Sequence, residues 1–331
     1  MQQNQFFTID DLWRETLRSI REQGQLTDSR VGTTRELLGF SATLSNIDST
    51  FLMNSRRKLS PHYACAEFLW YLNSNPNISM ISAYAPQYVK FAEGDRAYGA
   101  YGYRLYSNLW GRDATPCCNT NGSSQLDEIV RVLTKSPDSR QAVLTLWEAN
   151  DLVHAVLGDH KDLPCTMSMQ FLIRNDKLHL IVTMRSNDAW LGLPYDVFAF
   201  TCIQRIIAMS IGIECGSYTH QAGSEHLYQK NWAAANEAVE CNLRPEQRRL
   251  QHGWDTQCCA GMDNAVFTAK EIEREARVGN LAAVEANGEM LRRLTANRSN
   301  VLYDAAMTCA NKWDVLMQPE SPILRDAIAR S

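Results

Sequence analysis

Long apolar runs are missing from this chain of 331 residues. None reaches the ~18 residues that a membrane span needs, and residues 1–15 lack a signal-peptide pattern. Strong charge is absent too, because the formal net charge is only −4, so nothing indicates binding along a nucleic-acid backbone. There is no internal repeat and no low-complexity linker. We expect small-molecule substrates, with neither a membrane nor a nucleic acid as partner.

Cysteine spacing of the kind that marks metal sites is also absent. The chain has ten cysteines, too few for its length to form a disulfide framework. The adjacent pairs Cys117-Cys118 and Cys258-Cys259 have neither CxxC spacing nor paired histidines nearby. Reduced and mostly buried thiols are therefore expected, which indicates a cytoplasmic protein without a metal site.

What is present is the composition of a globular protein with a substantial core. Apolar residues make up 45% and charged residues 21% of the chain, both ordinary values. Helical and alternating apolar patterns both occur. We expect a compact α+β domain over residues 1–240, with a charged helical extension over residues 241–331 packed on the same domain.

The expected elements follow from periodicity and capping residues. Helices are predicted at Thr8–Gln23, Pro61–Leu72, Leu126–Thr134 and Tyr195–Ile213, and from Ser224 onward. Strands are predicted at Ala142–Trp147, Thr166–Ile173, Leu178–Met184 and Ser217–Ala222. Residues 28–35 read as a polar loop whose two arginines suit a phosphate.

One hairpin organises the candidate chemistry. The turn Arg174–Lys177 joins the strands Thr166–Ile173 and Leu178–Met184. Pairing of these strands brings Cys165, just before the first, to Arg185, just after the second. A potential nucleophile then lies beside a cation, with the carboxylate of Asp188 nearby.

Two acidic residues, Glu67 and Asp196, lie in apolar helices, and the role of each can be interpreted in two ways. Glu67 lies among Phe68, Leu69 and Trp70, so it is either at an exposed edge or buried with a raised pKa that suits proton transfer. Asp196 begins a helix that is apolar nearly all round, so it is either an ordinary cap or part of a site.

Over residues 24–235 the chain resembles the thymidylate synthase superfamily. The family's landmarks occur in order: Arg30, Glu67, the Tyr98-Gly99 or Tyr101-Gly102 pair, Pro137–Arg140, Pro164-Cys165, Arg185–Asp188, Leu191–Pro194 and His226–Tyr228. The resemblance implies an α+β fold with a mixed sheet, helices packed on one face, and a homodimer formed sheet to sheet.

Departures from the usual synthase pattern indicate a subtype. Thr166 stands where His usually follows the nucleophile, and Asp196 stands where Asn is usual; both are similar to phage-type deoxycytidylate 5-hydroxymethyltransferase. The apolar synthase tail and the folate-side Trp are not recognisable. Gln141 replaces the second of two arginines that reach the partner's phosphate site.

The resemblance also implies roles for named residues. The catalytic set is Cys165, Glu67, Asp188 and Tyr101, with Tyr98 as the alternative tyrosine. The nucleotide-binding set is Arg30, Arg140, Arg185, Ser186, Asp196, His226 and Tyr228. The folate-binding set is Asp188, Leu191 and Gly192, with 5,10-methylenetetrahydrofolate as co-substrate and no metal.

The implied chemistry starts with a thiolate that adds to C6 of a pyrimidine, with the pKa of Cys165 lowered by Arg185. Glu67 organises water and moves protons. An ionised Asp196 accepts hydrogens from N4 and protonated N3 of cytosine but faces the O4 lone pairs of uracil. Such a mismatch can discriminate by up to ~10⁴.

We therefore expect hydroxymethylation of dCMP, with CMP as the alternative nucleotide. The product's destination, modified phage DNA or a nucleoside natural product, is left open. Two other functions compete: methylation of dUMP by a thymidylate synthase, which Asp196 and the missing tail disfavour, and a silent homologue that only binds nucleotide. The intact set of Cys165, Glu67 and Arg185 argues against the silent homologue.

Overall fold

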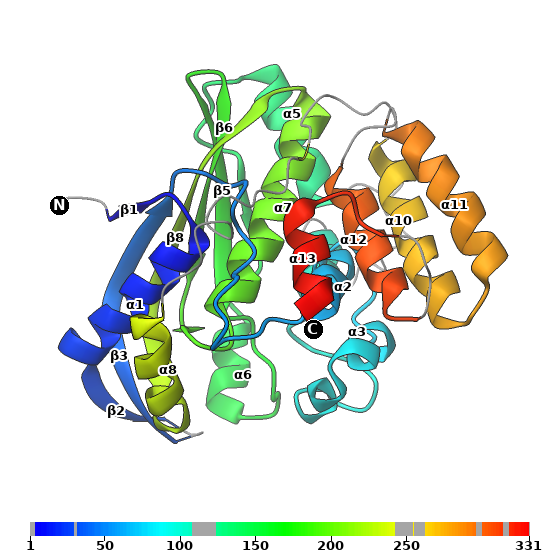
Figure 1. Ribbon diagram of the computed structural model, residues 1–331. Coiled ribbons are helices and arrows are strands. Elements are labelled where there is room, and N and C mark those ends of the chain that lie inside the picture. The colour runs from blue at the N-terminus through cyan, green and yellow to red at the C-terminus, as the bar shows by residue number, and fades with distance from the viewer. Residues whose placement is uncertain are drawn as a thin grey trace.

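The computed structural model describes residues 4–29, 32–107, 124–241, 254, 262–295, 300–313 and 318–330. Its centre is an eight-stranded mixed sheet (Figure 1). The strands are β1 (Gln5–Phe6), β2 (Gln25–Ser29), β3 (Gly32–Leu44), β4 (Val143–Thr145), β5 (Thr166–Arg174), β6 (Lys177–Met184), β7 (Asn187–Asp188) and β8 (Glu214–Tyr228). Their main order is β1-β3-β8-β6-β5-β4, with β2 on β3 and β7 on β8.

The predicted hairpin is β5–β6. The turn between the two strands contains Asn175 and Asp176, with φ of 51° and 56°, the left-handed conformation that Asn and Asp tolerate best. The strands pair antiparallel from Arg174↔Lys177 to Thr166↔Met184. On the other side β6 pairs parallel to β8, which makes the sheet mixed, as expected.

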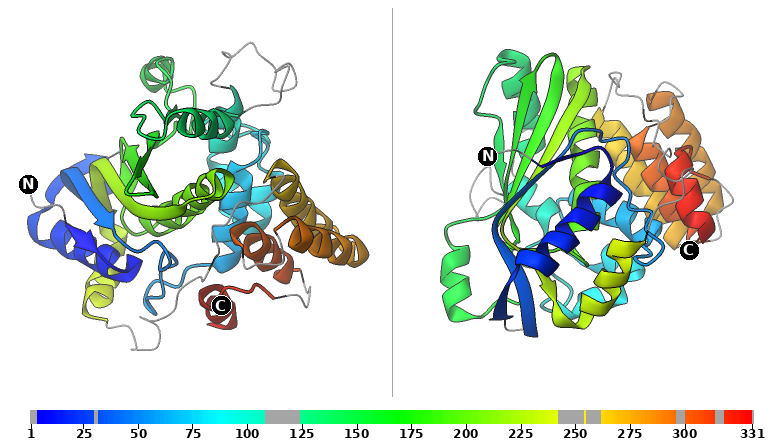
Figure 2. Two further views of the ribbon diagram at one scale, coloured as in Figure 1. Left: turned by 90° about the horizontal axis from the view of Figure 1, so that it is seen from above. Right: turned by 60° about the vertical axis from the view of Figure 1, so that its left-hand side comes forward.

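Helices α1 (Ile9–Gln23), α5 (Gln125–Lys135) and α7 (Leu193–Ile211) pack against one face of the sheet (Figures 1 and 2). The Thr8 hydroxyl accepts a hydrogen bond from the Asp11 amide and begins α1 as predicted. Helix α7 is buried along nearly its whole length and ends at Gly212, which has φ of 81°. The predictions of these three helices are confirmed.

The described ranges contain further helical segments beside α1, α5 and α7. They are α2 (Pro61–Tyr71), α3 (Ser79–Tyr84), η1 (Pro86–Lys90), α4 (Tyr101–Ser107), α6 (Asp151–Leu157), η3 (Gln229–Asn231), α8 (Trp232–Glu240), α10 (Met262–Arg277), α11 (Leu281–Leu294), α12 (Val301–Asn311) and α13 (Pro322–Arg330). None of the helices in the described ranges is long and apolar enough to cross a membrane.

The C-terminal helices dock on α2, the helix that carries Glu67. Helix α12 packs along α2, Lys270 of α10 donates to the Leu72 carbonyl at 3.2 Å, and the Tyr84 hydroxyl donates to Glu273 at 3.0 Å. Helices α10 and α12 thus pack against α2 and its C-terminal end. The division of the chain at residue 240 stays a prediction.

Two sequence-based expectations are wrong. Ser224–Tyr228 is not the start of a helix but the end of β8, where it pairs with β3 and β7. The polar segment Asp28–Arg35 is not a loop, because the hairpin of β2 and β3 runs through it, with Ser29 paired to Gly32. In both places main-chain bonds to a neighbouring strand outweigh local polarity.

A buried ion pair joins α4 to α6. The Arg104 guanidinium donates to both carboxylate oxygens of Asp151 at 2.9 and 3.0 Å and to the Leu146 carbonyl, and its side chain is only 2% exposed. Removing one partner of such a pair is costly, because the other charge stays buried.

We predict that Asp151→Ala lowers the free energy of unfolding by about 3 kcal/mol, because it leaves the buried Arg104 charge with only Glu148, 3.6 Å away, as an ionic partner. Chemical denaturation followed by circular dichroism measures this change. Asp138→Ala, which removes an exposed carboxylate, is the matched control and should change stability by less than about 0.5 kcal/mol. Equal effects of the two substitutions would contradict the prediction.

Candidate active site

Cys165 and Arg185 meet at the open end of the β5–β6 hairpin. The Arg185 amide donates to the Cys165 carbonyl at 2.8 Å, which continues the ladder by one pair. The guanidinium donates to the carbonyls of Pro164 at 2.9 Å and Leu163 at 3.1 Å, and one of its nitrogens lies 3.6 Å from the Cys165 sulfur. Main-chain carbonyls thus hold the cation beside the thiol.

The surroundings of the thiol nevertheless do not favour the thiolate. Burial raises the pKa of Cys165, the Arg185 charge opposes this effect, and the charges of Asp196 and Asp162 add to it. Arg185 thus lowers the pKa of Cys165, as expected, but burial of the thiol outweighs this single cation and the net shift is upward.

Tyr101 is the tyrosine that lies beside the nucleophile. Its hydroxyl accepts hydrogen bonds from the amide of Thr166 at 3.1 Å and from the Thr166 hydroxyl at 3.0 Å. Tyr98 points elsewhere: its hydroxyl donates to Asp151 at 3.1 Å, and its ring stacks on His160. Thr166, the residue that follows Cys165, thus holds the Tyr101 hydroxyl near the nucleophile.

Glu67 is buried in α2 rather than exposed at an edge. Its side chain accepts a hydrogen bond from the Tyr63 hydroxyl at 2.7 Å. Burial raises the pKa of Glu67 to about 7, while the hydroxyls of Tyr63 and Tyr71 oppose the rise. A carboxyl group with such a pKa can take up and release a proton near neutral pH.

Asp196 lies in the first turn of α7 and faces the same region. The N-cap residue of this helix, Gly192, makes no side-chain hydrogen bond, and Asp196 is the acidic residue of the first turn. Burial and then the Glu67 charge raise the pKa of Asp196 well above its usual range, and the Asn187 amide opposes them. Gly192 is required here, since a Cβ would lie 2.6 Å from Asn187 Oδ1 and 3.1 Å from Asp196 Oδ2.

Sequence reasoning missed a polar network behind Asp196. Asn187 Nδ2 lies 2.8 Å from His220 Nε2, and His220 Nδ1 lies 2.8 Å from the Tyr218 hydroxyl. Glu225 is fully buried, and burial followed by the Asp196 and Asp188 charges raises its pKa well above the usual range. Polar residues at the inward positions of β8 were the available signal, but residues 224–228 were expected to be helical.

Ser186, His226 and Tyr228 lie together where β7 meets β8. Ser186 Oγ is 3.3 Å from His226 Nδ1, and the rings of His226 and Tyr228 meet edge to face at 5.1 Å. Asp188 pairs with His226 across the strands, and its Oδ1 accepts the amides of Trp190 and Leu191 at 2.8 and 3.0 Å. Asp188 thus shapes the turn that carries Leu191 and Gly192.

Two arginines of the expected nucleotide site remain to be placed. Arg30 lies outside the described residues. Arg140 is exposed, and its carbonyl accepts a hydrogen bond from Gln170 in the middle of β5. Five strand residues separate Gln170 from Cys165, a distance of about 16 Å. Within one chain, Arg140 is therefore remote from the thiol.

The comparisons with known proteins agree with this architecture. Residues 11–259 match the family model described as thymidylate synthase, which makes the protein a transferase of one-carbon groups. The chain belongs to the thymidylate synthase family. It is similar to the thymidylate synthases of three strains of Francisella tularensis subsp. holarctica (FTNF002-00 / FTA, OSU18 and LVS), each 25% identical over 233 residues, or 67% of this chain and 81% of the relative. The family uses methylenetetrahydrofolate as co-substrate and acts on a pyrimidine nucleotide.

The pKa of Glu67 depends on its neighbouring hydroxyl. Tyr63→Phe removes the hydrogen bond that favours the ionised carboxylate, so we predict a rise of the pKa from about 7 by about one unit, on the scale of a charged hydrogen bond. Infrared titration of the carboxyl C=O band, assigned with Glu67→Gln, measures it. Tyr195→Phe, whose hydroxyl accepts from the Ser60 amide, is the control, and a fall of the pKa in Tyr63→Phe would refute the prediction.

Proposed function

We propose that the protein hydroxymethylates C5 of a cytidine monophosphate, with dCMP preferred and CMP as the alternative, using 5,10-methylenetetrahydrofolate and water. The observation that carries this proposal is Asp196, a carboxyl group in the first turn of α7 that faces Asn187 and has a raised pKa. Methylenetetrahydrofolate supplies the one-carbon unit. The residues of the chain supply the nucleophile, the proton transfers and the recognition of the base.

In this proposal Cys165 forms a bond from sulfur to C6, which makes C5 a nucleophile. Because the pKa of the thiol is raised, its proton must leave as the bond forms. C5 then bonds to the one-carbon unit and loses its hydrogen as a proton. As that proton leaves C5, the bond from the one-carbon unit to tetrahydrofolate breaks, which releases tetrahydrofolate and leaves an exocyclic methylene. Water then adds to the methylene carbon, and the bond between sulfur and C6 breaks. The hydroxymethylated base and tetrahydrofolate are the products.

Glu67 serves in this scheme as the group that moves protons and organises the water. A pKa of about 7 suits both directions of transfer at neutral pH. Tyr63, which donates to Glu67 at 2.7 Å, orients the carboxylate.

Asp196 selects the base in a different way from an ionised carboxylate. Its raised pKa means that it holds a proton, which it can donate to the lone pair on N3 of cytosine while it accepts a hydrogen from N4. Attack at C6 makes N3 more basic, so the proton passes to N3 and an ion pair forms in the transition state. Uracil can donate its N3–H to the acid and accept from it at O4, but N3 cannot take up the proton, so the ion pair does not form in the transition state.

The remaining contacts, with the phosphate, the sugar and the folate, are inferred from the resemblance to the family. We propose that Arg185 and Ser186, together with Arg30, bind the phosphate, and that His226 and Tyr228 bind the sugar. Asp188, Leu191 and Gly192 would contact the folate. Residues 1–240 would be the catalytic domain and residues 241–331 its helical extension. The six described cysteines carry free thiols, in keeping with a cytoplasmic enzyme.

A second candidate is methylation of dUMP. The curated relatives are named thymidylate synthases, and the family match covers residues 11–259. Hydroxymethylation is preferred because Asp196 offers a transferable proton to cytosine.

The activity prediction is that the wild-type protein with methylenetetrahydrofolate releases tritium from C5-labelled dCMP, more slowly from CMP, and hardly at all from dUMP. Cys165→Ser should release none while still binding nucleotide, because oxygen is a poorer nucleophile than sulfur at C6. Release from dUMP alone would assign the protein as a thymidylate synthase. Release by Cys165→Ser at a rate near wild type would exclude the covalent route.

The specificity prediction concerns Asp196→Asn. An amide can accept N3–H and donate to O4 of uracil, but it has no proton to give to N3 of cytosine. We expect kcat/KM for the cytosine nucleotide to fall about 10- to 100-fold, the scale of a charged hydrogen bond, and that for dUMP to rise. An unchanged ratio of the two kcat/KM values would remove Asp196 from base recognition.

The assembly prediction is a homodimer in which Arg140 acts in the partner's site. The outward side of the sheet is partly apolar, with Val143, Met167 and Leu38 exposed, and Arg140 is remote from Cys165 of its own chain. Mixing Arg140→Ala and Cys165→Ser subunits should restore part of the activity, because one site of a heterodimer has both groups. A fully active monomer in sedimentation would disprove this assembly.

A further inference from the structure

Outside the candidate active site, three side chains with metal-ligating groups lie together in and after α6. They are His154, Asp159 and His160, here called the His154 cluster, and each offers one nitrogen or oxygen atom within 4.8 Å of the others. CxxC spacing, the sequence pattern of many zinc sites, does not mark this cluster, because it contains no cysteine.

The local sequence explains why the three side chains meet. Gly158 ends α6 with φ of 64°, and its amide donates to the His154 carbonyl at 2.8 Å. This left-handed turn folds the next two residues back over the helix. As a result His154 Nδ1 lies 3.0 Å from Asp159 Oδ1, and the rings of His154 and His160 lie 4.5 Å apart.

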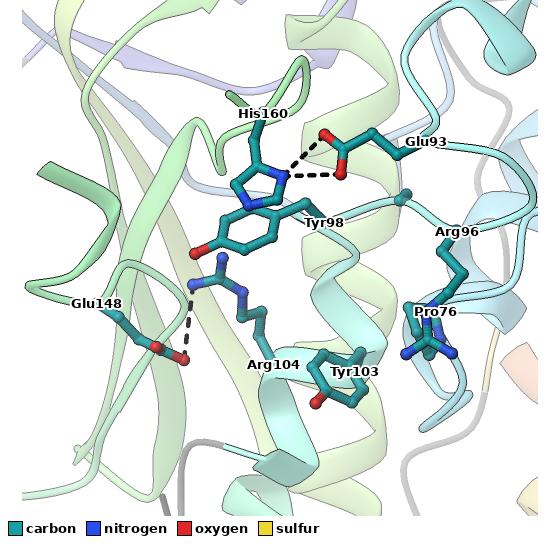
Figure 3. Close-up of a pocket in the computed structure, with 9 residues that line it drawn as sticks. Pro76, Glu93, Arg96, Tyr98, Tyr103, Arg104, Glu148 and His160 are labelled. Atoms are coloured by element: carbon teal, nitrogen blue, oxygen red, sulfur yellow. Dashed lines mark hydrogen bonds and ion pairs between the residues drawn. The ribbon is translucent and has the colours of Figure 1, made fainter. Parts of the chain in front are cut away.

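His160 is held in the orientation that metal ligands commonly have. Glu93 faces Nδ1 of His160 with both carboxylate oxygens, at 2.8 and 2.7 Å (Figure 3), and the ring stacks on Tyr98 at 3.8 Å. A proton on Nδ1 leaves the Nε2 lone pair for a cation. A metal-bound histidine usually donates a hydrogen bond from its second ring N–H group to a carboxylate in this way.

Charge and access also suit a divalent cation. Asp159 and Glu93 contribute two negative charges, which balance a doubly charged ion. The nearby cations are engaged elsewhere: Arg104 with Asp151, and Lys161 Nζ with the Ala92 carbonyl. Asp159 is 43% exposed and the two histidines are partly exposed, so an ion can reach the cluster from solvent.

We propose that the His154 cluster binds one divalent transition-metal ion of the Zn²⁺ class through His154, Asp159 and His160, with Glu93 orienting His160. Two imidazoles and one carboxylate form a ligand set typical of zinc. His154 also contacts the Asn150 amide, 3.1 Å from Nε2, which must turn away if that nitrogen is the ligand. The ion would stabilise the segment that leads to Cys165. None of its ligands takes part in the proposed reaction, so this inference does not rest on the proposed function.

The first test adds Co²⁺ to the full-length protein after treatment with a chelator. We expect one bound ion per chain and an absorption spectrum of nitrogen and oxygen ligands. A thiolate-to-metal charge-transfer band would assign binding to cysteines and overturn the proposal. Binding of no ion at micromolar Co²⁺ or Zn²⁺ would overturn it as well.

The second test uses variants, with Zn²⁺ affinity measured by competition with a chromophoric chelator. His160→Ala and Asp159→Asn should abolish the competition, and Glu93→Gln should weaken affinity about 10- to 100-fold, as expected for a residue that orients a ligand. His179→Ala, whose imidazole bonds to Ser217 on the sheet, is the matched control and should bind like the wild type. Unchanged affinity in His160→Ala, with a native circular dichroism spectrum, would refute the site.

Discussion

The pairing of β5 with β6 is the constraint on which the candidate site depends. Their register places Thr166 opposite Met184, so that Cys165 and Arg185 extend the same ladder. Main-chain carbonyls of Leu163 and Pro164 then hold the guanidinium beside the sulfur. A slip of one residue would turn alternate side chains to the other face of the sheet and separate this pair.

Burial of acidic groups is the second physical theme of the site. Loss of solvent raises the pKa values of Glu67, Asp196 and Glu225, and the charges of neighbouring carboxylates add to it for Asp196 and Glu225. Groups so arranged hold protons near neutral pH and can donate them. The protons held by these acidic groups are therefore as important for the chemistry of the site as the thiol is. The apolar side chains of helices α2 and α7 keep water away from these acidic groups.

Much of the fold could be predicted from local pattern. The cap at Thr8, the Asn175-Asp176 turn and the apolar run of α7 each act over a few residues, and each was interpreted correctly. The errors at residues 28–35 and 224–228 have one cause: β3 lies between β2 and β8, and pairing with a distant strand leaves little trace in a short polar segment.

The sequence by itself determined the family, the order of its motifs and the meeting of Cys165 with Arg185, because strand pairing across a short turn is a local property. Only the tertiary structure decided which tyrosine lies beside Thr166, that Glu67 is buried, and that the thiol keeps a raised pKa. It alone brought His220 to Asn187 and Glu93 to His160. These features depend on desolvation and on distances between segments far apart in the chain, which no local pattern encodes.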